Sequence, residues 1–255
     1  MLERLNRRDL LSFLGGTVAV SLAGCLRGQS AATNGTNASP QSMAQSMAQP
    51  TPTPPHCIVR PQQTEGPYFI DEGLNRSDIR SDPSDGSIRP GIPLRLTFQV
   101  TQTDGRSCVP LSGAIVDIWH CDALGVYSDV VDRGASTVGQ KFLRGAQTTD
   151  ANGTATFTTI YPGWYPGRAV HIHFKIRTAA AAQQGYEFTS QLYFDDALSD
   201  RIRTLSPYAA NGQRHQRNNQ DRIFQQGGED LMLQLTEEAQ GYVSTFTIGL
   251  QLPRV

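Results

Sequence analysis

The sequence has little excess charge and few cysteines or histidines. Its 255 residues include 22 Lys and Arg against 23 Asp and Glu, so the formal net charge is only -1. A chain this close to neutral lacks the basic surface that attracts nucleic acid or an anionic membrane. The composition therefore predicts neither a nucleic-acid partner nor membrane binding by the folded part of the chain.

The apolar stretch 10–23 is too short to span a bilayer, for which about 20 residues are needed. Paired Arg7 and Arg8 precede it, as in a twin-arginine export signal, and it ends in "SLAGC", which resembles a bacterial lipobox with Cys25 as the lipidated residue. The alternatives are an N-terminal anchor helix and an uncleaved signal. We expect residues 1–25 to direct export out of the cytoplasm, with a lipid on Cys25 as the only membrane attachment.

Bulky apolar residues are almost absent from residues 26–55, which are rich in Ser, Ala, Gln, Thr and Pro. Such a segment cannot bury enough apolar surface to offset the entropy lost on ordering. We interpret 26–55 as a disordered linker. The remaining residues, 56–255, have the length of one all-β domain.

Four cysteines are too few for a disulfide-rich scaffold, and no two of them have the spacing of a zinc site. With Cys25 assigned to the lipid, Cys57, Cys108 and Cys121 remain, which is an odd number for an oxidising compartment. We expect a Cys57–Cys108 disulfide with Cys121 free, but the sequence alone leaves the pairing open.

Helical patterns are scarce, and strand patterns dominate the domain. Leu94, Leu96, Phe98 and Val100 alternate with polar residues, which is the period of a half-buried strand. Further strands are expected at 112–120, 153–160, 169–176, 188–194 and 242–252, and short helices at 196–205 and 228–235. Short strands separated by Gly and Pro turns predict an antiparallel β-sandwich of the immunoglobulin or prealbumin type with long loops.

Two of the five histidines lie in one expected strand, "VHIHFKI". Because side chains alternate along a strand, His171 and His173 project from one face while Val170, Ile172 and Phe174 project from the other. Two imidazoles one pleat apart are typical of a metal site. The alternative is a pair of polar residues on a solvated face.

No acidic residue follows these histidines at a spacing that would complete a cupin-like site. The nearby candidates are tyrosines, namely Tyr127, Tyr161 and Tyr165. A free phenol has a pKa near 10, so only a hard, highly charged cation makes the phenolate available at neutral pH. Mixed phenolate and imidazole ligands therefore favour ferric iron over zinc or copper.

Several motifs in the order found here resemble those of the intradiol ring-cleavage dioxygenases, which include protocatechuate 3,4-dioxygenase and catechol 1,2-dioxygenase. They are "TEGPYF", "VDIWHCDALGVYS", "RGAQTTDANGTATFTTIYPGWYPGRAVHIHFKI" and "SQLYFDD". The resemblance covers most of residues 57–255. It implies a β-sandwich that binds Fe(III) without haem and cleaves a catechol-type ring with O2 to a muconate-type dicarboxylate.

Matched position by position, the resemblance implies Tyr127, Tyr165, His171 and His173 as the metal ligands, with Tyr165 also acting in catalysis. It implies that Arg168 stabilises charge on the substrate ring and that Gln191 lines the same pocket. Tyr161 is then a packing residue, and Tyr68 lies at the rim of the pocket.

The chain departs from the family in lacking the helical dimerisation segment of the catechol 1,2-dioxygenases, and the link from Tyr165 to His171 is short. We therefore expect an open, shallow pocket that admits a substituted aromatic larger than catechol. Two other functions remain open at this point. They are a non-enzymatic cell-surface β-sandwich that serves as a binding module, and a surface copper protein.

Overall fold

A computed structural model describes residues 57–132, 134–178 and 185–252. The predicted signal (1–25), the predicted linker (26–55) and His56 lie outside the described residues. Within the described ranges, no helix has the length and apolar character needed to cross a membrane.

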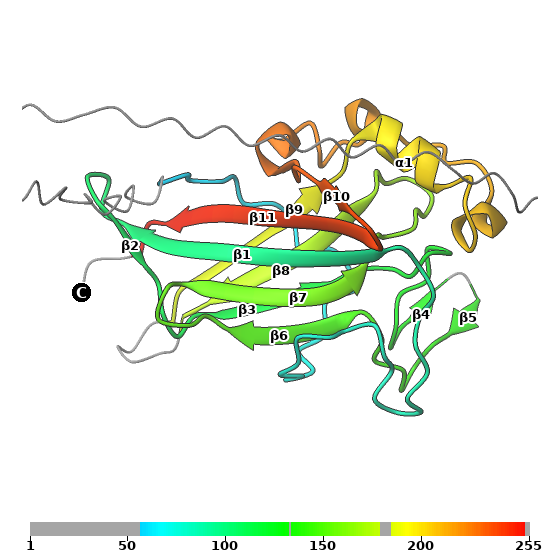
Figure 1. Cartoon of the computed structure of the whole chain (residues 1–255), viewed down its shortest axis with the longest axis horizontal. Coiled ribbons are helices and arrows are strands. Elements are labelled where there is room, and N and C mark those ends of the chain that lie inside the picture. The colour runs from blue at the N-terminus through cyan, green and yellow to red at the C-terminus, as the bar shows by residue number, and fades with distance from the viewer. Residues whose placement is uncertain (1–56, 133, 179–184, 253–255) are drawn as a thin grey trace, which may run out of the picture. The chain divides into compact units, whose positions relative to one another are not determined.

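Two sheets form the framework of the described chain (Figure 1), and β4 and β5 form a separate hairpin. The strands are β1 Pro93–Thr103, β2 Cys108–Pro110, β3 Ile115–Trp119, β4 Val131–Asp132, β5 Ala135–Ser136, β6 Arg144–Thr148, β7 Thr154–Ile160, β8 His171–Arg177, β9 Glu187–Tyr193, β10 Thr236–Glu238 and β11 Gly241–Leu250. One sheet has the order β10-β11-β1-β2, with β7 also paired to β1, and the other has the order β6-β3-β8-β9. The predicted sandwich is therefore confirmed.

One strand pair differs from the expected antiparallel arrangement. β1 and β11 lie side by side in Figure 1 and pair in parallel, from Leu94 opposite Tyr242 to Gln102 opposite Leu250. The other paired strands of the two sheets are antiparallel. An alternating pattern defines which face of a strand is buried, but it carries no information about the direction of the partner strand.

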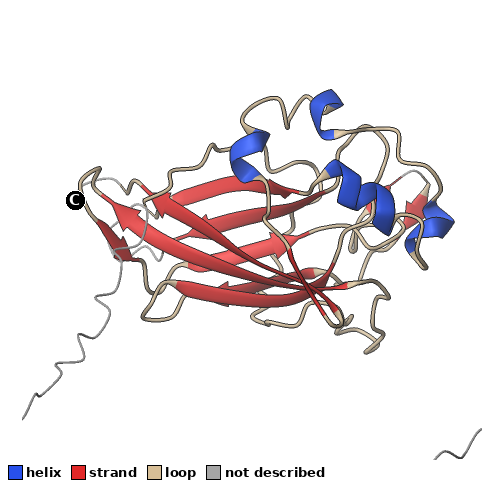
Figure 2. Ribbon diagram, turned by 45° about the horizontal axis from the view of Figure 1, so that its top comes forward, coloured by secondary structure: helices blue, strands red, loops and turns tan. Residues whose placement is uncertain are grey.

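Helix is a minor component, and Figure 2 shows the helices together on one side of the molecule. The helices are α1 Asp196–Ile202 and the 3-10 turns η1 Tyr208–Asn211, η2 Asn218–Gln220 and η3 Gly228–Leu231. The predicted helix at 196–205 corresponds to α1, which begins where the Asp195 carboxylate accepts a hydrogen bond from the Leu198 amide. The second predicted helix, at 228–235, is only the single turn η3. The chain leaves the helical conformation at Met232, which is extended.

The apolar faces of the two sheets meet in one core. The alternating residues of β1, from Leu94 to Val100, are fully buried. The ring centroids of Phe98 in one sheet and Phe174 in the other lie 5.4 Å apart, and the Phe246 ring packs against both. Fully burying a side chain of this size stabilises the fold by roughly 1.5–3 kcal/mol. This core fixes the position of β8, which carries the histidine pair.

The disulfide and the strands that sequence analysis missed lie toward the edges. Cys57 and Cys108 are bonded, as expected, and Cys121 is buried and takes no part in this disulfide. β2, β4, β5 and β10 are only two or three residues long, and β6 ("RGAQT") has no aromatic residue and a single β-branched one, Thr148. β2, β4, β5 and β10 pair with the strand next to them in sequence, whereas β6 pairs with the more distant β3.

Candidate active site

The two histidines of β8 are buried on the face that points away from the inter-sheet core. Ile172, Phe174 and Ile176 belong to that core, whereas His171 and His173 are only 2% and 1% exposed on the opposite side. The alternative of two polar residues on a solvated face is therefore wrong. Two imidazoles have been taken out of water together, which costs free energy unless another group satisfies their nitrogen atoms.

Residues 64–71, here called the strap, are tied to this polar face of β8. Lys175 forms an ion pair with Glu65 (2.5 Å), and Arg177 forms one with Asp71 (2.6 Å). Both cations lie on β8 and both carboxylates lie on the strap. A segment more than 100 residues earlier in the chain therefore closes the histidine side of the sheet.

Two contacts hold the ring of His173. Gly66 of the strap has φ +74°, and a Cβ atom on it would lie 3.2 Å from His173 Cε1. On the other side, the Trp119 ring stacks on the His173 ring with centroids 5.0 Å apart and planes at 5°. Glycine is required at position 66 both for its backbone conformation and for this close approach.

Nitrogen and oxygen atoms converge at His171. Its Nδ1 lies 2.7 Å from the Ala169 carbonyl, which can only accept, so Nδ1 carries the proton and Nε2 presents a lone pair. His173 Nε2 lies 3.0 Å from His171 Nε2, and the Tyr165 hydroxyl lies 3.1 Å from the same His171 nitrogen. This carbonyl contact orients His171 in the way that a metal-binding histidine is commonly oriented.

Tyr127 completes the cluster. The centroid of its ring lies 5.6 Å from the centroid of the Tyr165 ring and 6.3 Å from that of the His173 ring. Tyr68 of the strap stacks on it with centroids 4.3 Å apart. The hydroxyl of Tyr127 is buried and makes no hydrogen bond of ordinary geometry with the described residues.

A buried arginine fixes the chain next to Tyr127. Arg144 donates to the Ser128 hydroxyl (2.9 Å), to the Ser128 carbonyl (2.7 Å) and to the Tyr68 carbonyl (2.7 Å). One guanidinium thus joins the strap to the residue that follows Tyr127. The sequence signals neither this contact nor the one between Trp119 and His173, because the partners come from different strands.

The donor set fits a bound cation. His171 Nε2 offers one lone pair, yet His173 Nε2 and the Tyr165 hydroxyl both lie within hydrogen-bond distance of it. Two ligands about 2.1 Å from one ion and about 90° apart lie about 3 Å from each other, which matches the two separations observed. No group of three or more His, Cys, Asp or Glu side chains in the described ranges could hold a metal. Among the described residues, the phenols of Tyr127 and Tyr165 lie next to the histidine pair and could supply further ligands.

Burial sets the protonation of these groups. Burial lowers the pKa of His171 well below its usual value, with a further contribution from the charge of Arg168, and the pKa of His173 is lowered in the same way. Burial likewise raises the pKa of Tyr127 and Tyr165 far above that of a free phenol. The imidazoles are therefore neutral and ready to bind a metal, whereas the phenols need a strongly charged cation to ionise.

Arg168 lies at the edge of the cluster and is held by groups distant in sequence. Its Nη1 lies 3.3 Å from His171 Nε2, its Nη2 donates to Gln191 Oε1, and its Nε donates to Asp221 (2.9 Å). Burial opposes its charge, but Tyr165 and Asp221 outweigh that effect and raise the pKa of Arg168. Arg168 is thus a permanent cation beside the cluster.

Gln191 and Asp221 restrain this arginine. The amide nitrogen of Gln191 donates to the Thr64 carbonyl (2.8 Å), so its oxygen faces Arg168. Asp221 is 1% exposed and also accepts from the Ala169 amide (2.9 Å). Sequence analysis named Gln191 but missed Asp221, since nothing in "NNQDRIF" distinguishes this acid from its neighbours.

Tyr161, which sequence analysis considered, and one further buried histidine, His120, lie outside the cluster. Tyr161 packs in the main core 4.5 Å from Phe194, and its hydroxyl lies 2.7 Å from that of Ser199, which agrees with a packing role. His120 is fully buried, but both of its ring nitrogens are occupied, by the Cys121 carbonyl and by the Thr159 hydroxyl.

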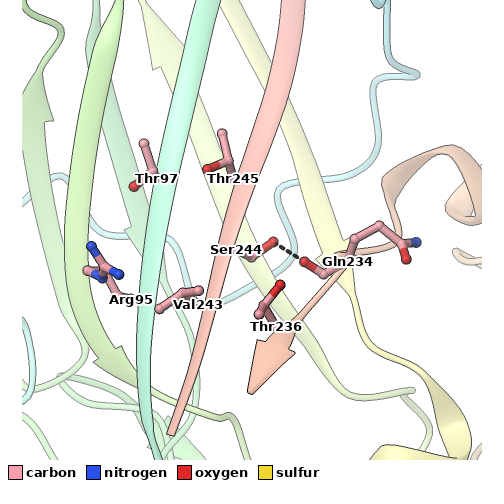
Figure 3. A pocket seen from close by; sticks show the side chains of 7 residues that line it. All are labelled: Arg95, Thr97, Gln234, Thr236, Val243, Ser244 and Thr245. Atoms are coloured by element: carbon pink, nitrogen blue, oxygen red, sulfur yellow. Dashed lines mark hydrogen bonds between the residues drawn. The ribbon is translucent and has the colours of Figure 1, made fainter. Parts of the chain in front are cut away.

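A separate hollow of about 190 Å³ lies on the other sheet, between β1, β10 and β11 (Figure 3). Figure 3 shows Thr97 and Arg95 along β1, and the hydrogen bond from the Ser244 hydroxyl to the Gln234 carbonyl (2.9 Å). Its lining residues include no histidine or carboxylate. This hollow therefore lacks groups for acid–base or metal chemistry.

Comparison with known proteins gives a consistent result. A family model described as Dioxygenase matches residues 64–210, which is more than half of the chain. An intradiol ring-cleavage dioxygenase from Tetranychus urticae is 32% identical in sequence, and the match covers 76% of this chain and 95% of that chain with a TM-score of 0.67.

Two curated relatives are more distant. Catechol 1,2-dioxygenase 1 from Acinetobacter lwoffii is 28% identical over 174 residues, which are 58% of this chain and 52% of that protein. The protocatechuate 3,4-dioxygenase beta chain from Burkholderia cepacia is 30% identical over 140 residues, which are 50% of this chain and 56% of that protein. The chain thus spans about half the length of these two relatives.

The six predicted site residues, from Tyr127 to Gln191, all fall within the matched range 64–210. The sandwich, the buried histidine pair and the adjoining tyrosines agree with the match in both sequence and structure. The chain belongs to the intradiol ring-cleavage dioxygenase family.

Proposed function

We propose that this protein is a ferric-iron enzyme that cleaves a catechol between its two hydroxyl-bearing carbons with O2, giving a muconate-type dicarboxylate. The observation that supports this most directly is the cluster of two neutral imidazoles and two buried phenols, in which the Tyr165 oxygen and His173 Nε2 each lie about 3 Å from His171 Nε2. His171, His173, Tyr127 and Tyr165 would hold the metal. When bound, ferric iron supplies a Lewis acid that binds the catechol oxygens and makes the ring reactive toward O2.

The residues of the chain have separable roles in this reaction. Once ionised by the bound cation, Tyr165 would be a strong base, because burial holds the pKa of its phenol high, and it would be suited to accept one of the two catechol protons. Arg168 is held in a site largely closed to water, where its fixed positive charge stabilises negative charge that develops on the substrate ring. Gln191 and Asp221 keep the guanidinium in that orientation.

The test combines activity with colour. The full chain, expressed with iron, is expected to consume O2 when catechol is added and to show the visible band of tyrosinate bound to ferric iron. Tyr127→Phe and His171→Ala are expected to lose iron or shift that band, whereas Tyr161→Phe, a buried tyrosine outside the cluster, is expected to keep it. A colourless, iron-free protein would favour the cell-surface binding module, and a blue one would favour the copper protein.

We also propose that the protein works outside the cytoplasm. The support is the Arg7–Arg8 pair ahead of a short apolar stretch that ends at Cys25. Replacing both arginines by lysine is expected to retain the protein in the cytoplasm. Cys25→Ala is expected to release it from the membrane fraction without blocking export. Cell fractionation distinguishes these outcomes.

A further inference from the structure

Tyr193 is the last residue of β9, and its side chain is fully buried. It lies opposite His171 in the pairing of β8 with β9, and it comes two residues after Gln191, so both side chains project from the same face of the strand. The centroid of its ring lies 6.2 Å from that of the His171 ring. A second polar side chain of β9 therefore lies beside the histidine pair.

The hydroxyl of Tyr193 lies between two glutamine side chains. It donates to Gln63 Oε1 at 2.8 Å and lies 3.2 Å from Gln191 Oε1. The Gln63 amide nitrogen donates to the Ile223 carbonyl at 2.8 Å. The Gln191 amide nitrogen donates to the Thr64 carbonyl, also at 2.8 Å. Both amide oxygens therefore face the hydroxyl, and its one proton serves two acceptors.

Each of these glutamines is linked to one of the two groups that hold Arg168. Gln191 Oε1 itself accepts from Arg168 Nη2. Gln63 holds the Ile223 carbonyl, and the Ile223 amide donates to Asp221 (2.8 Å). Asp221 in turn accepts from Arg168 Nε (2.9 Å). One phenol hydroxyl thus joins the two anchors of the guanidinium, which come from β9 and from the segment after η2.

The ring of Tyr193 makes a separate contact with the segment that carries Asp221. Phe224, three residues after Asp221, packs against this ring edge-on with centroids 5.0 Å apart. The Phe224 ring is confined in turn by Gly228, where a Cβ would lie 2.4 Å from Phe224 Cδ2. Replacing the tyrosine by phenylalanine would therefore keep the ring packing and remove only the hydroxyl.

We propose that Tyr193 is a positioning residue for Arg168, whose hydroxyl fixes the separation of Gln191 and Asp221 and thereby the orientation of the guanidinium. The inference rests on the proposed function, in which Arg168 stabilises negative charge on the substrate ring. Anchors that moved independently would leave the cation mobile, and a cation displaced from the place where charge develops stabilises that charge less. The effect of Tyr193 on the reaction passes through Arg168.

The kinetic test is Tyr193→Phe in the iron-loaded full chain, with catechol as the substrate. We expect kcat to fall about tenfold with KM within about twofold of the wild type, because the hydroxyl affects charge that develops during the reaction and not binding. The iron content and the visible tyrosinate band are expected to stay unchanged, since the proposed metal ligands are untouched. In an Arg168→Lys background, the same change is expected to lower kcat by less than about twofold, because the guanidinium that Tyr193 positions is gone.

The matched control is Tyr161→Phe, which also removes a buried hydroxyl, one that lies 2.7 Å from the Ser199 hydroxyl in the main core. This variant is expected to keep the wild-type kcat. An unchanged kcat in Tyr193→Phe, or an equal fall in the Arg168→Lys background, would overturn the proposal.

A second readout needs no turnover. It is the hydrogen exchange of Arg168 Nε–H, followed by NMR on the full chain with diamagnetic Ga(III) in place of iron and assigned by its loss in Arg168→Lys. We expect this exchange to be at least about tenfold faster in Tyr193→Phe and unchanged in Tyr161→Phe, because local opening becomes easier only where an anchor is lost. If no catechol is cleaved, the proposed function fails and the exchange rate decides the inference. Faster exchange in Tyr193→Phe alone supports the positioning role, and equal exchange refutes it.

Discussion

Replacing Asp221 by asparagine should weaken both the fold and the reaction, because this carboxylate anchors Arg168. One of its oxygens accepts from Arg168 Nε and from the Ala169 amide, both at 2.9 Å, and the other accepts from the Ile223 amide at 2.8 Å. An asparagine has a single acceptor oxygen. If that oxygen keeps Ile223, its NH2 group faces two N–H donors.

The cost follows from the burial of the pair. The Asp221 side chain is 1% exposed and that of Arg168 is 13% exposed, so water cannot replace the lost acceptor. Two buried donors without partners cost about 1–3 kcal/mol each, and removing one member of a buried ion pair costs about 3–5 kcal/mol. We therefore expect Asp221→Asn to lower the free energy of unfolding by about 3–5 kcal/mol. We also expect kcat/KM for catechol to fall about 100-fold, since Arg168 is no longer held in place.

Urea unfolding and steady-state kinetics measure the two effects. The control is Asp78→Asn, which removes a carboxylate that pairs with Arg80 and is 49% exposed, and it should cost less than about 1 kcal/mol. In the Asp221→Asn background, the further change Arg168→Met should lower the free energy of unfolding by little, because the guanidinium has already lost its carboxylate partner. A loss no larger than that of Asp78→Asn would refute the assignment of Asp221 as the anchor of Arg168.

Three further outcomes are expected. Gly66→Ala should lower the iron content and reduce the free energy of unfolding by about 1–2 kcal/mol, since it strains a positive φ and brings a Cβ against His173. The control Gly73→Ala, at φ +59° with no atom within 4 Å of the new Cβ, should lower stability without loss of iron. Burial lowers the pKa of His120 to about 4, so only the unfolded chain takes up this proton between pH 6.5 and 4, and stability falls as the pH falls through that range. Unfolding of metal-free His120→Gln at several pH values should therefore show about 3 kcal/mol less pH dependence than the wild type. Replacing both Cys57 and Cys108, which are 51 positions apart, by serine should lower the free energy of unfolding by about 4 kcal/mol. An unchanged midpoint in denaturant unfolding would contradict the expected role of the disulfide.

Much of the architecture was predictable because its signals are local. The alternation from Leu94 to Val100 identified β1, and the same period in "VHIHFKI" placed both histidines on one face of β8. The motif order carried the family assignment, which the match over residues 64–210 confirms. The Cys57–Cys108 bond was also expected correctly, although composition alone left the pairing open.

The surroundings of the site were not predictable from local signals. The strap and Trp119 reach His173, and Asp221 reaches Arg168, from positions at least 50 residues away in the sequence. Nothing in the sequence indicates that Arg144 joins Tyr68 to Ser128. Such contacts depend on how strands from different parts of the chain pair and how loops close over them, which no periodicity encodes.

The sequence by itself determined the strand periodicity, the buried apolar face of β8 and the types of side chain available as ligands, because a two-residue repeat and the chemistry of imidazole and phenol are properties of single residues and their neighbours. Only the tertiary structure decided that β1 and β11 run in parallel, that the strap removes His171 and His173 from water, and that the Tyr165 oxygen and two imidazole nitrogens lie about 3 Å apart. The reason is physical: burial and convergence are properties of the folded chain as a whole, and they fix which groups ionise and what the site can bind.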